Sequence, residues 1–330
     1  AKPFLISMIM LSAVTSYYMD TLGVVIDRDM IQNVMVTTIT ESKHLLTAGF
    51  VSHVFMFGVI PSAALALVRM KRFGPFRTLA PPFVVTTLSL ALSAGLLMSD
   101  LKSYSSILRE RKDYMSSFQP GAPIVGAVRF AKMMRRSANI EVVAVGEDAK
   151  KGVAYGGQKK PLLTIVVAGE TARSQNFSLN GYAVETNPKL AALPVISFSD
   201  VNSCGTATAT SLPCMFSKFD RSSYSFEKGI SHHSVLDVLD HAGLHVEWWD
   251  NNTGDKSIAA RLPKRSFTHI EDTAFCDGGE CIDGVFLQAL KDYTATITQD
   301  TVLVLHQIGR LSTELLLQMS LRVHCRYQNY

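Results

Sequence analysis

Hydrophobic side chains form long runs in the first hundred residues and short runs after them. Residues 45–68 and 78–99 contain no Asp, Glu, Lys or Arg, and each reaches the ~20 residues that a helix needs to cross a hydrocarbon core. A third apolar stretch, 3–19, is slightly shorter. Since two adjacent runs of this length are unusual for buried helices of a soluble protein, the pattern predicts a transmembrane domain at 1–100 with about three spans near these ranges.

The charges between the apolar runs predict their orientation. The loop between the two long runs holds a basic cluster made of Arg69, Lys71, Arg72 and Arg77, and short loops rich in Lys and Arg stay in the cytoplasm. The segment 20–41 is mainly acidic, which favours the opposite side of the membrane. With three spans, everything after Asp100 is then expected outside the cytoplasm.

The segment after the membrane domain has a mixed pattern. Basic residues alternate with aromatic and aliphatic ones in 103–136, which is typical of an amphipathic helix on a membrane surface. A solvated linker fits the same pattern equally well. The Gly-rich stretch 152–160 then marks a boundary. We therefore predict an amphipathic extracytoplasmic linker at 101–155.

Short apolar runs beyond the linker predict an α/β domain. The runs 162–168, 195–198, 244–249 and 301–305 have the length of buried strands, and they alternate with helix-like stretches such as 234–241 and 283–293. Continuous apolar strands alternating with helices indicate a largely parallel sheet. Because functional groups in such sheets collect beyond the carboxyl ends of the strands, the residues that follow each run are the candidates for a site.

Those strand-end residues include several reactive types. Glu170 follows the first run, a hydroxyl-rich segment at 203–214 follows the second, Lys256 lies a few residues after the third, and His306 closes the fourth. A carboxylate together with His or Asp suits zinc, and a hydroxyl beside such a metal loses its proton more easily. Each residue alone has a structural explanation, and only their joint placement favours a site. Spacing does not choose the nucleophile among Ser203, Thr206, Thr208, Thr210 and Ser211.

Cysteines and overall composition restrict the remaining classes. Cys204 and Cys214 lie ten apart, Cys276 and Cys281 five apart, and Cys325 is left over. Neither pair has the C-x-x-C spacing of a zinc site, so two short-loop disulfides of an oxidising compartment are predicted. The chain is 47% hydrophobic and 18% charged with a net charge of +4. These values exclude a disordered chain, and without a basic tract they give no support for a nucleic-acid partner.

Several long motifs resemble one known family. VVAGETARSQNFSLNGY, ETNPKL, SCGTATATSLPCMFS, WWDNNTGDK and VLHQIG, together with MDTLGVVIDRDMIQNV in the membrane part, resemble the lipid A phosphoethanolamine transferases, which include the mobile colistin-resistance enzymes. The resemblance implies an alkaline-phosphatase-like, sulfatase-type α/β domain on a membrane-helix anchor. It implies an inner-membrane enzyme with its catalytic domain in the periplasm, which moves phosphoethanolamine from phosphatidylethanolamine to lipid A and confers polymyxin resistance.

The resemblance also implies roles for individual residues. Glu170 matches a zinc ligand, and Thr208 matches the nucleophile that touches the zinc and carries phosphoethanolamine covalently. The positions expected to hold the phosphoryl group or substrate are Thr253 and Lys256. A second set matches residues proposed to bind the ethanolamine lipid, and its spacing of four would place it on one helix face: Asn33, Thr37 and Glu41. The family disulfides correspond to Cys204–Cys214 and Cys276–Cys281.

The resemblance stops at Gly309. The family continues with a Ser/Asn-His-Gly-Pro motif and a long region that carries an Asp–His zinc pair, whereas this sequence continues with RLSTELLLQMSLRVHCRYQNY. We therefore expect 156–309 to be the N-terminal part of an incomplete catalytic domain and 310–330 a non-family tail. A truncated chain with one carboxylate ligand is expected to be inactive. The alternatives are a non-catalytic membrane protein and a related sulfatase-fold hydrolase or glycerol-phosphate transferase.

Overall fold

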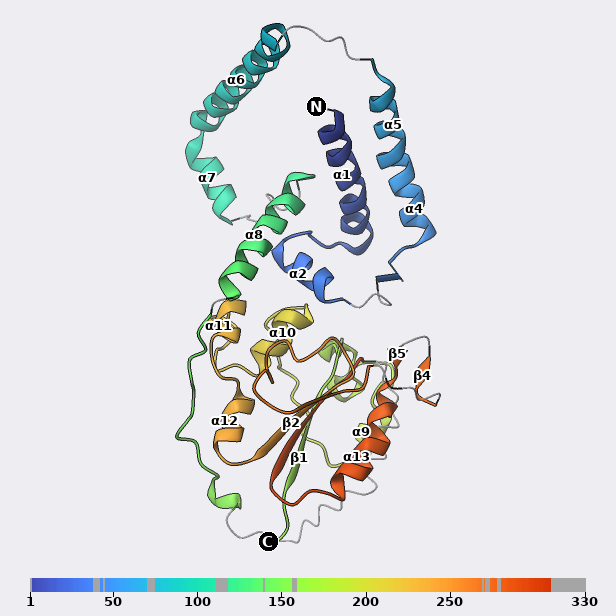
Figure 1. Ribbon diagram of the computed structural model, residues 1–330, viewed down its shortest axis with the longest axis vertical. Helices are drawn as coiled ribbons and strands as arrows, with labels where there is room; N and C mark the ends of the chain where they lie inside the picture. Colours follow the sequence, from blue (N-terminus) through green and yellow to red (C-terminus); the bar gives the residue numbers. More distant parts are fainter. Residues whose placement is uncertain are drawn as a thin grey trace. The chain divides into compact units, whose positions relative to one another are not determined.

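The computed structural model describes residues 2–37, 42–43, 45–69, 75–110, 118–138, 140–155, 159–268, 270, 274–277 and 280–309. It divides into two compact units, one of residues 1–35 and 41–132 and one of residues 36–40 and 133–330. Figure 1 labels their helices and strands. The predicted tail at 310–330 lies outside the described residues.

The first unit contains the predicted membrane helices. Three helices are long and apolar enough to cross a membrane, at Lys2–Leu22, Ala48–Leu67 and Ala80–Ser99, as the charge-free runs predict. The helices of the membrane and linker regions are α1 (Lys2–Leu22), α2 (Arg28–Val36), α4 (Ala48–Val54), the π-helical η1 (Phe55–Val59), α5 (Ile60–Leu67), α6 (Pro75–Ser99), α7 (Leu101–Glu110) and α8 (Gly121–Ser137).

The second span approaches α1 closely and contains a local distortion. A Cβ at Gly58 would lie 3.0 Å from Met10 Sδ and 3.2 Å from Ala13 Cβ, so glycine allows the close approach of helices that is common in membranes. The π-helical segment η1 ends at Val59, two residues before Pro61. Proline lacks an N–H and its ring collides with the preceding turn, so a wider turn before it relieves the clash.

The second unit is built on a four-stranded parallel sheet with strand order β1-β6-β2-β3. Its strands are β1 (Leu163–Ala168), β2 (His245–Asp250), β3 (Lys264–Ser266) and β6 (Thr301–His306). A separate antiparallel pair consists of β4 (Cys276–Asp277) and β5 (Glu280–Cys281). The parallel sheet predicted from the continuous apolar runs is therefore present, and its central strand β6 is buried along its whole length.

Helices cover both faces of this sheet. One core cluster joins β2 and β6 to α10 (Thr208–Met215) and α12 (Val235–His241), and the other joins them to α13 (Phe286–Thr294). Figure 1 shows α12 and α13 on opposite sides of the strands. The remaining short helices are η3 (Val153–Tyr155), η4 (Ser174–Asn176), η5 (Ser178–Asn180), α9 (Pro188–Ala191), α11 (Phe226–Ile230) and η6 (Asp283–Val285).

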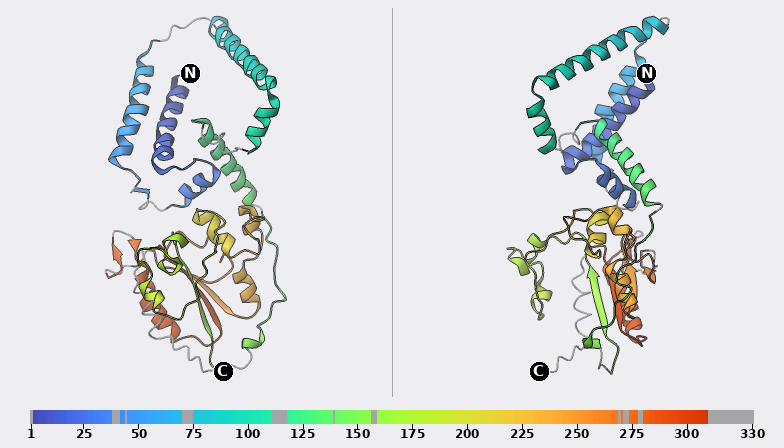
Figure 2. Two further views of the ribbon diagram at one scale, coloured as in Figure 1. Left: turned by 180° about the vertical axis from the view of Figure 1, so that it is seen from behind. Right: turned by 90° about the vertical axis from the view of Figure 1, so that its left-hand side faces the viewer.

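One predicted strand is wrong and one strand was missed. The run Val195–Phe198 forms no strand, and Ile196 and Phe198 are 84% and 73% exposed. The side view in Figure 2 shows the segment with η4, η5 and α9 extending away from the sheet, so this apolar run has no neighbouring strand with which to pair. In contrast, Lys264–Ser266 pairs with β2, although it is polar, because a short charged strand suits the edge of a sheet.

A buried ion pair holds α12 in place. Asp237 is 3% exposed, and its carboxylate accepts hydrogen bonds from Arg261 at 2.8 and 2.6 Å and from the Ser234 N–H at 2.6 Å. Burial acts to raise the pKa of Asp237, but the hydrogen bonds from Arg261 and Ser234 outweigh it and lower the pKa below 3.8. The ionised carboxylate is therefore the form that stabilises the fold.

Replacing Asp237 with alanine is expected to lower the unfolding free energy of this unit by about 3 kcal/mol, because the Arg261 cation and the Ser234 N–H lose their partner. The stabilisation should be complete above about pH 4 and should disappear as the pH falls through the lowered pKa of the folded state. Both tryptophans of the chain, Trp248 and Trp249, are buried in this unit, so urea unfolding followed by tryptophan fluorescence measures the change. An equal unfolding free energy for D237A and wild type would contradict it.

Candidate active site

The carboxyl ends of three strands lie in register at one edge of the sheet. Ala168 of β1 pairs with His306 of β6, and His306 pairs with Asp250 of β2. Because the strands are parallel, the segments that follow them emerge at this same edge. The residues predicted after the first, third and fourth runs therefore lie at one edge of the sheet, whereas the hydroxyl-rich segment follows a run that forms no strand.

Glu170 and Thr208 are in direct contact at this edge. The Thr208 hydroxyl donates a hydrogen bond to Glu170 Oε2 at 2.9 Å, and the Thr171 hydroxyl donates one to Oε1 at 3.1 Å. Thr171 adopts a left-handed backbone with φ of 54°, which costs a non-glycine residue of order 1–3 kcal/mol and is found preferentially at functional sites. The carboxylate thus holds a hydroxyl on each of its oxygens.

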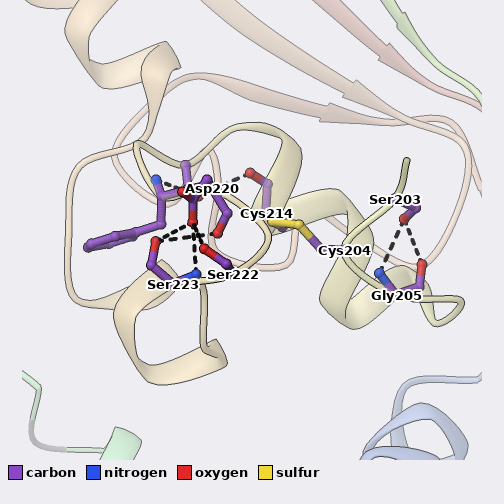
Figure 3. The surroundings of a disulfide bond; sticks show 9 residues. Ser203, Cys204, Gly205, Cys214, Asp220, Ser222 and Ser223 are labelled. Carbon is purple, nitrogen blue, oxygen red and sulfur yellow. Dashed lines mark hydrogen bonds between the residues drawn. A yellow bond between two sulfur atoms is a disulfide. The ribbon is translucent and has the colours of Figure 1, made fainter. Parts of the chain in front are cut away.

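Thr208 is positioned by a helix and a disulfide rather than by a strand. It is the first residue of α10, and the Cys204–Cys214 disulfide joins the loop before this helix to its last turn (Figure 3). The second predicted disulfide, Cys276–Cys281, is also formed. The prediction of two short-loop disulfides is confirmed, and the first of them restrains the segment that carries Thr208.

A tight turn follows α10 near the disulfide, as Figure 3 shows. Asp220 Oδ1 accepts hydrogen bonds from the Ser223 hydroxyl at 2.6 Å and from the Ser222 hydroxyl and the Ser223 N–H at 2.8 Å. These bonds, led by that from the Ser223 side chain, lower the pKa of Asp220 to about 2. The turn is a local structural feature in which the charge of Asp220 is satisfied by its own loop.

Lys256 extends the site with a positive charge. Its Nζ donates a hydrogen bond to the Thr253 carbonyl oxygen at 2.5 Å. Burial lowers the pKa of Lys256, and the carboxylates of Asp250, Asp255 and Glu170 oppose this shift. Lys256 therefore lies within electrostatic reach of Glu170. Thr253 takes part through its backbone in this contact.

A buried Asp–His pair lies directly beneath these loops. His306 Nδ1 and Asp250 Oδ1 are 2.6 Å apart, and the N–H groups of Asn252 and Gly254 donate to Asp250 Oδ2. Burial would raise the pKa of Asp250, but the hydrogen bonds from His306 and the backbone lower it. Within the described residues, His306 Nε2 is buried without a hydrogen-bond partner. One feature of the sequence indicates this pair: the apolar runs 244–249 and 301–305 are followed directly by Asp250 and His306.

Gly309 closes one side of the site. Its φ is +83°, and a Cβ at this position would lie 2.8 Å from the Glu170 carbonyl oxygen and 3.0 Å from Glu170 Cβ. Only glycine adopts this backbone readily and fits this space. The loop after β6 therefore packs directly against the residue that carries the carboxylate.

The structure describes only two of the three residues that are predicted to bind the ethanolamine lipid. Asn33 lies in α2, which ends at Val36, and Thr37 follows directly as a bend. Glu41 lies outside the described residues. The common helical face expected for the three is therefore not seen, because the described helix contains only Asn33.

The metal-binding capacity of the site is limited in the described part of the chain. No group of three or more His, Cys, Asp or Glu side chains among those residues is arranged to share a metal ion. Glu170 and Thr208 present two adjacent oxygens, which is half of the tetrahedral set that zinc usually takes in proteins. The donor set described so far does not by itself complete a zinc site.

Comparison with known proteins gives consistent matches to both units. The family model for "Phosphoethanolamine transferase EptA/EptB" matches residues 1–134, and the "Sulfatase" model matches residues 163–310. Phosphoethanolamine transferase EptA of Escherichia coli K12 is 36% identical over 312 residues, covering 93% of this chain and 56% of that protein. Phosphatidylethanolamine transferase Mcr-1 of Escherichia coli is 35% identical, covering 93% of this chain and 59% of that protein.

A solved structure supports the same relationship. The integral membrane protein lipooligosaccharide phosphoethanolamine transferase A (EptA) from Neisseria meningitidis superimposes with a TM-score of 0.83 at 32% sequence identity, covering 93% of this chain and 57% of that one. The chain thus spans little more than half the length of the relatives that it matches. From its membrane helices through its sulfatase-type domain, the chain is similar to phosphoethanolamine transferases.

Proposed function

We propose that the protein transfers phosphoethanolamine from phosphatidylethanolamine to lipid A through a covalent intermediate on Thr208, and thereby confers polymyxin resistance. The observation that carries this proposal is the 2.9 Å hydrogen bond from the Thr208 hydroxyl to Glu170 at the carboxyl edge of the sheet. A hydroxyl whose proton already points at a carboxylate has its lone pairs free for attack. The relatives named above are phosphoethanolamine or phosphatidylethanolamine transferases.

The reaction divides into two displacements at phosphorus. In the first, Glu170 takes the Thr208 proton, Thr208 Oγ1 forms a bond to phosphorus, the bond from phosphorus to the glycerol oxygen breaks, and diacylglycerol leaves with the proton that Glu170 passes on. In the second, a lipid A phosphate oxygen forms a bond to phosphorus, the bond from phosphorus to Thr208 Oγ1 breaks, and Thr208 is reprotonated by the proton that the lipid A phosphate releases through Glu170. Lys256, near Glu170, stabilises negative charge on the phosphoryl oxygens in both steps.

Zinc is the metal proposed for the site, with Glu170 and Thr208 as two of its ligands. A bound divalent cation would neutralise charge on the phosphoryl oxygens and lower the pKa of the adjacent hydroxyl. These two oxygens are held together by the fold before any metal arrives, since Thr208 donates to Glu170. The described residues contribute only this half of the ligand set.

The donor lipid and the cellular location are proposed from the similarity to phosphoethanolamine transferases and from the apolar helices of the first unit. Asn33, Thr37 and Glu41 are proposed to hold the ethanolamine head group, and the membrane in question is the bacterial inner membrane. The second unit is proposed to lie in the periplasm, where its two disulfides would persist. The three apolar helices supply the means to stay at the membrane that holds the lipid.

A labelling experiment tests the function. The purified chain is reconstituted into vesicles that contain phosphatidylethanolamine or, as the control, only phosphatidylcholine, and the Thr208 peptide is examined by mass spectrometry. A phosphoethanolamine adduct on Thr208 in the first vesicles alone is the expected result. An adduct on another hydroxyl would contradict the role of Thr208 as nucleophile. The absence of any adduct would contradict the proposal as a whole and favour the inactive chain that the sequence predicts.

A further inference from the structure

Asp283 is a buried carboxylate that lies outside the set of residues used in the proposed reaction. It begins η6, directly after the hairpin closed by the Cys276–Cys281 disulfide, and it is 1% exposed. A buried carboxylate costs folding free energy unless its oxygens are well bonded. Its hydrogen bonds should therefore show what the fold gains from it.

The hydrogen bonds of Asp283 all lead to loops at the edge of the sheet. Its Oδ1 accepts from Asn251 Nδ2 at 3.0 Å and from the Ile308 N–H at 2.9 Å, while its Oδ2 is buried without a hydrogen-bond partner among the described residues. Asn251 in turn donates through Nδ2 to the Cys281 carbonyl at 2.9 Å and through its backbone N–H to the His306 carbonyl at 2.9 Å. The Asp283 and Asn251 side chains thus connect the segment after β2, the segment after β6 and the disulfide hairpin through hydrogen bonds.

The segment after β6 carries this restraint to the candidate active site. Asp283 accepts a hydrogen bond from the Ile308 N–H, and the next residue, Gly309, packs on Glu170 at a distance that leaves no space for a Cβ. Asp283 itself has no hydrogen bond to Glu170 or Thr208 in the described part of the chain. Any effect on Thr208 must pass through the loop and the backbone of Glu170.

We propose that Asp283 is a positioning residue, which fixes the 307–309 loop against Glu170 and so sets the carboxylate toward the Thr208 hydroxyl. The expected effect on the reaction rests on the function proposed above. The expected effect on the position of the 307–309 loop rests only on the hydrogen bonds of Asp283. Misplacement of a reacting group by about 1 Å can cost ~10²-fold in rate, so a positioning residue of this kind has a measurable effect without touching substrate.

The surroundings of the Asp283 carboxyl group predict which substitution is tolerated at this position. Burial raises the pKa of Asp283, and the hydrogen bonds from Asn251 and Ile308 only partly oppose it. An uncharged group that still offers one oxygen should therefore serve at this position. Asn at 283 keeps an acceptor for the Ile308 N–H, whereas Ala removes it and leaves this N–H without its partner.

The first measurement is amide hydrogen exchange of the full chain in detergent micelles, for wild type, D283A and D283N. We expect D283A to speed exchange in 307–309 and in 169–173 by roughly 10-fold while the centres of β2 and β6 stay protected, and D283N to restore the wild-type rates. Asp220→Ala, which removes an exposed carboxylate bonded to its own turn, is the control. Exchange unchanged in D283A, or increased equally across the whole sheet, would overturn the proposal.

The second measurement is the rate of adduct formation on Thr208 at saturating phosphatidylethanolamine. A positioning role predicts that D283A lowers this maximal rate about 10-fold at an unchanged half-saturating lipid content, with rescue by D283N; a shift in half-saturation alone would contradict it. Should D283A fail to fold, D283S, whose hydroxyl is too short to reach the loop, replaces it. If the wild type forms no adduct, the proposed function fails, and hydrogen exchange alone decides whether Asp283 fixes the loop.

Discussion

Replacing Thr208 with alanine is expected to abolish the phosphoethanolamine adduct, with a loss of roughly 10³-fold or more in the rate of lipid-dependent labelling. The variant removes the only side-chain oxygen that hydrogen-bonds to Glu170 Oε2 in the described residues. In the described part of the chain, no other hydroxyl of the 203–211 segment donates a hydrogen bond to this carboxylate, so none should replace it. Intact-protein mass spectrometry after incubation with phosphatidylethanolamine vesicles measures the loss.

Two further variants separate the hydroxyl from the fold of its helix. T208S keeps the hydroxyl and loses only the methyl group, so it should retain labelling within about 10-fold of wild type. T210A removes a neighbouring hydroxyl of α10, where the Thr210 side chain packs on Gly205 rather than on Glu170, and it should label at the wild-type rate. Labelling that persists in T208A and disappears in T210A would contradict the proposal, because it would show that Thr210 is the nucleophile.

Local sequence patterns were sufficient for the membrane helices and for most of the sheet. The charge-free runs predicted three spans because length and apolarity are the main requirements for crossing a bilayer. The runs at 162–168, 244–249 and 301–305 predicted β1, β2 and β6 because strands buried on both faces are continuously apolar. The same rule failed at Val195–Phe198, since an apolar run becomes a strand only where a neighbouring strand is available to bond its backbone.

Interactions between distant segments were beyond such patterns. The spacing of the residues did not decide which of five hydroxyls is the nucleophile, and only the resemblance to the family selected Thr208. Its hydrogen bond to Glu170 joins residues 38 positions apart. The Asp250–His306 contact spans 56 positions and depends on the register of two parallel strands. Asp283 had no motif of its own, because its role arises only when three loops meet.

Glu170→Gln is expected to lower the rate of Thr208 labelling about 10²- to 10³-fold. The amide oxygen still accepts the Thr208 hydrogen bond, but it has no negative charge with which to take the proton or to bind the proposed zinc. The comparison isolates charge because size and hydrogen-bond geometry are nearly kept. E185Q, which makes the same change at an exposed glutamate, is the matched control and should label normally. Vesicle binding should be unchanged in both variants, so the loss would lie in the chemical step.

The pattern across Glu170 variants distinguishes proton transfer from simple support of the loop. E170D keeps the charge but withdraws it by one methylene from the Thr208 hydroxyl, so a proton acceptor predicts an intermediate rate, below wild type and above E170Q. If Glu170 only supports the loop through its backbone contact with Gly309, all three side chains should give nearly the same rate. Equal labelling in wild type, E170D and E170Q would therefore show that the carboxylate has no chemical role, and it would contradict the proposed activation of Thr208.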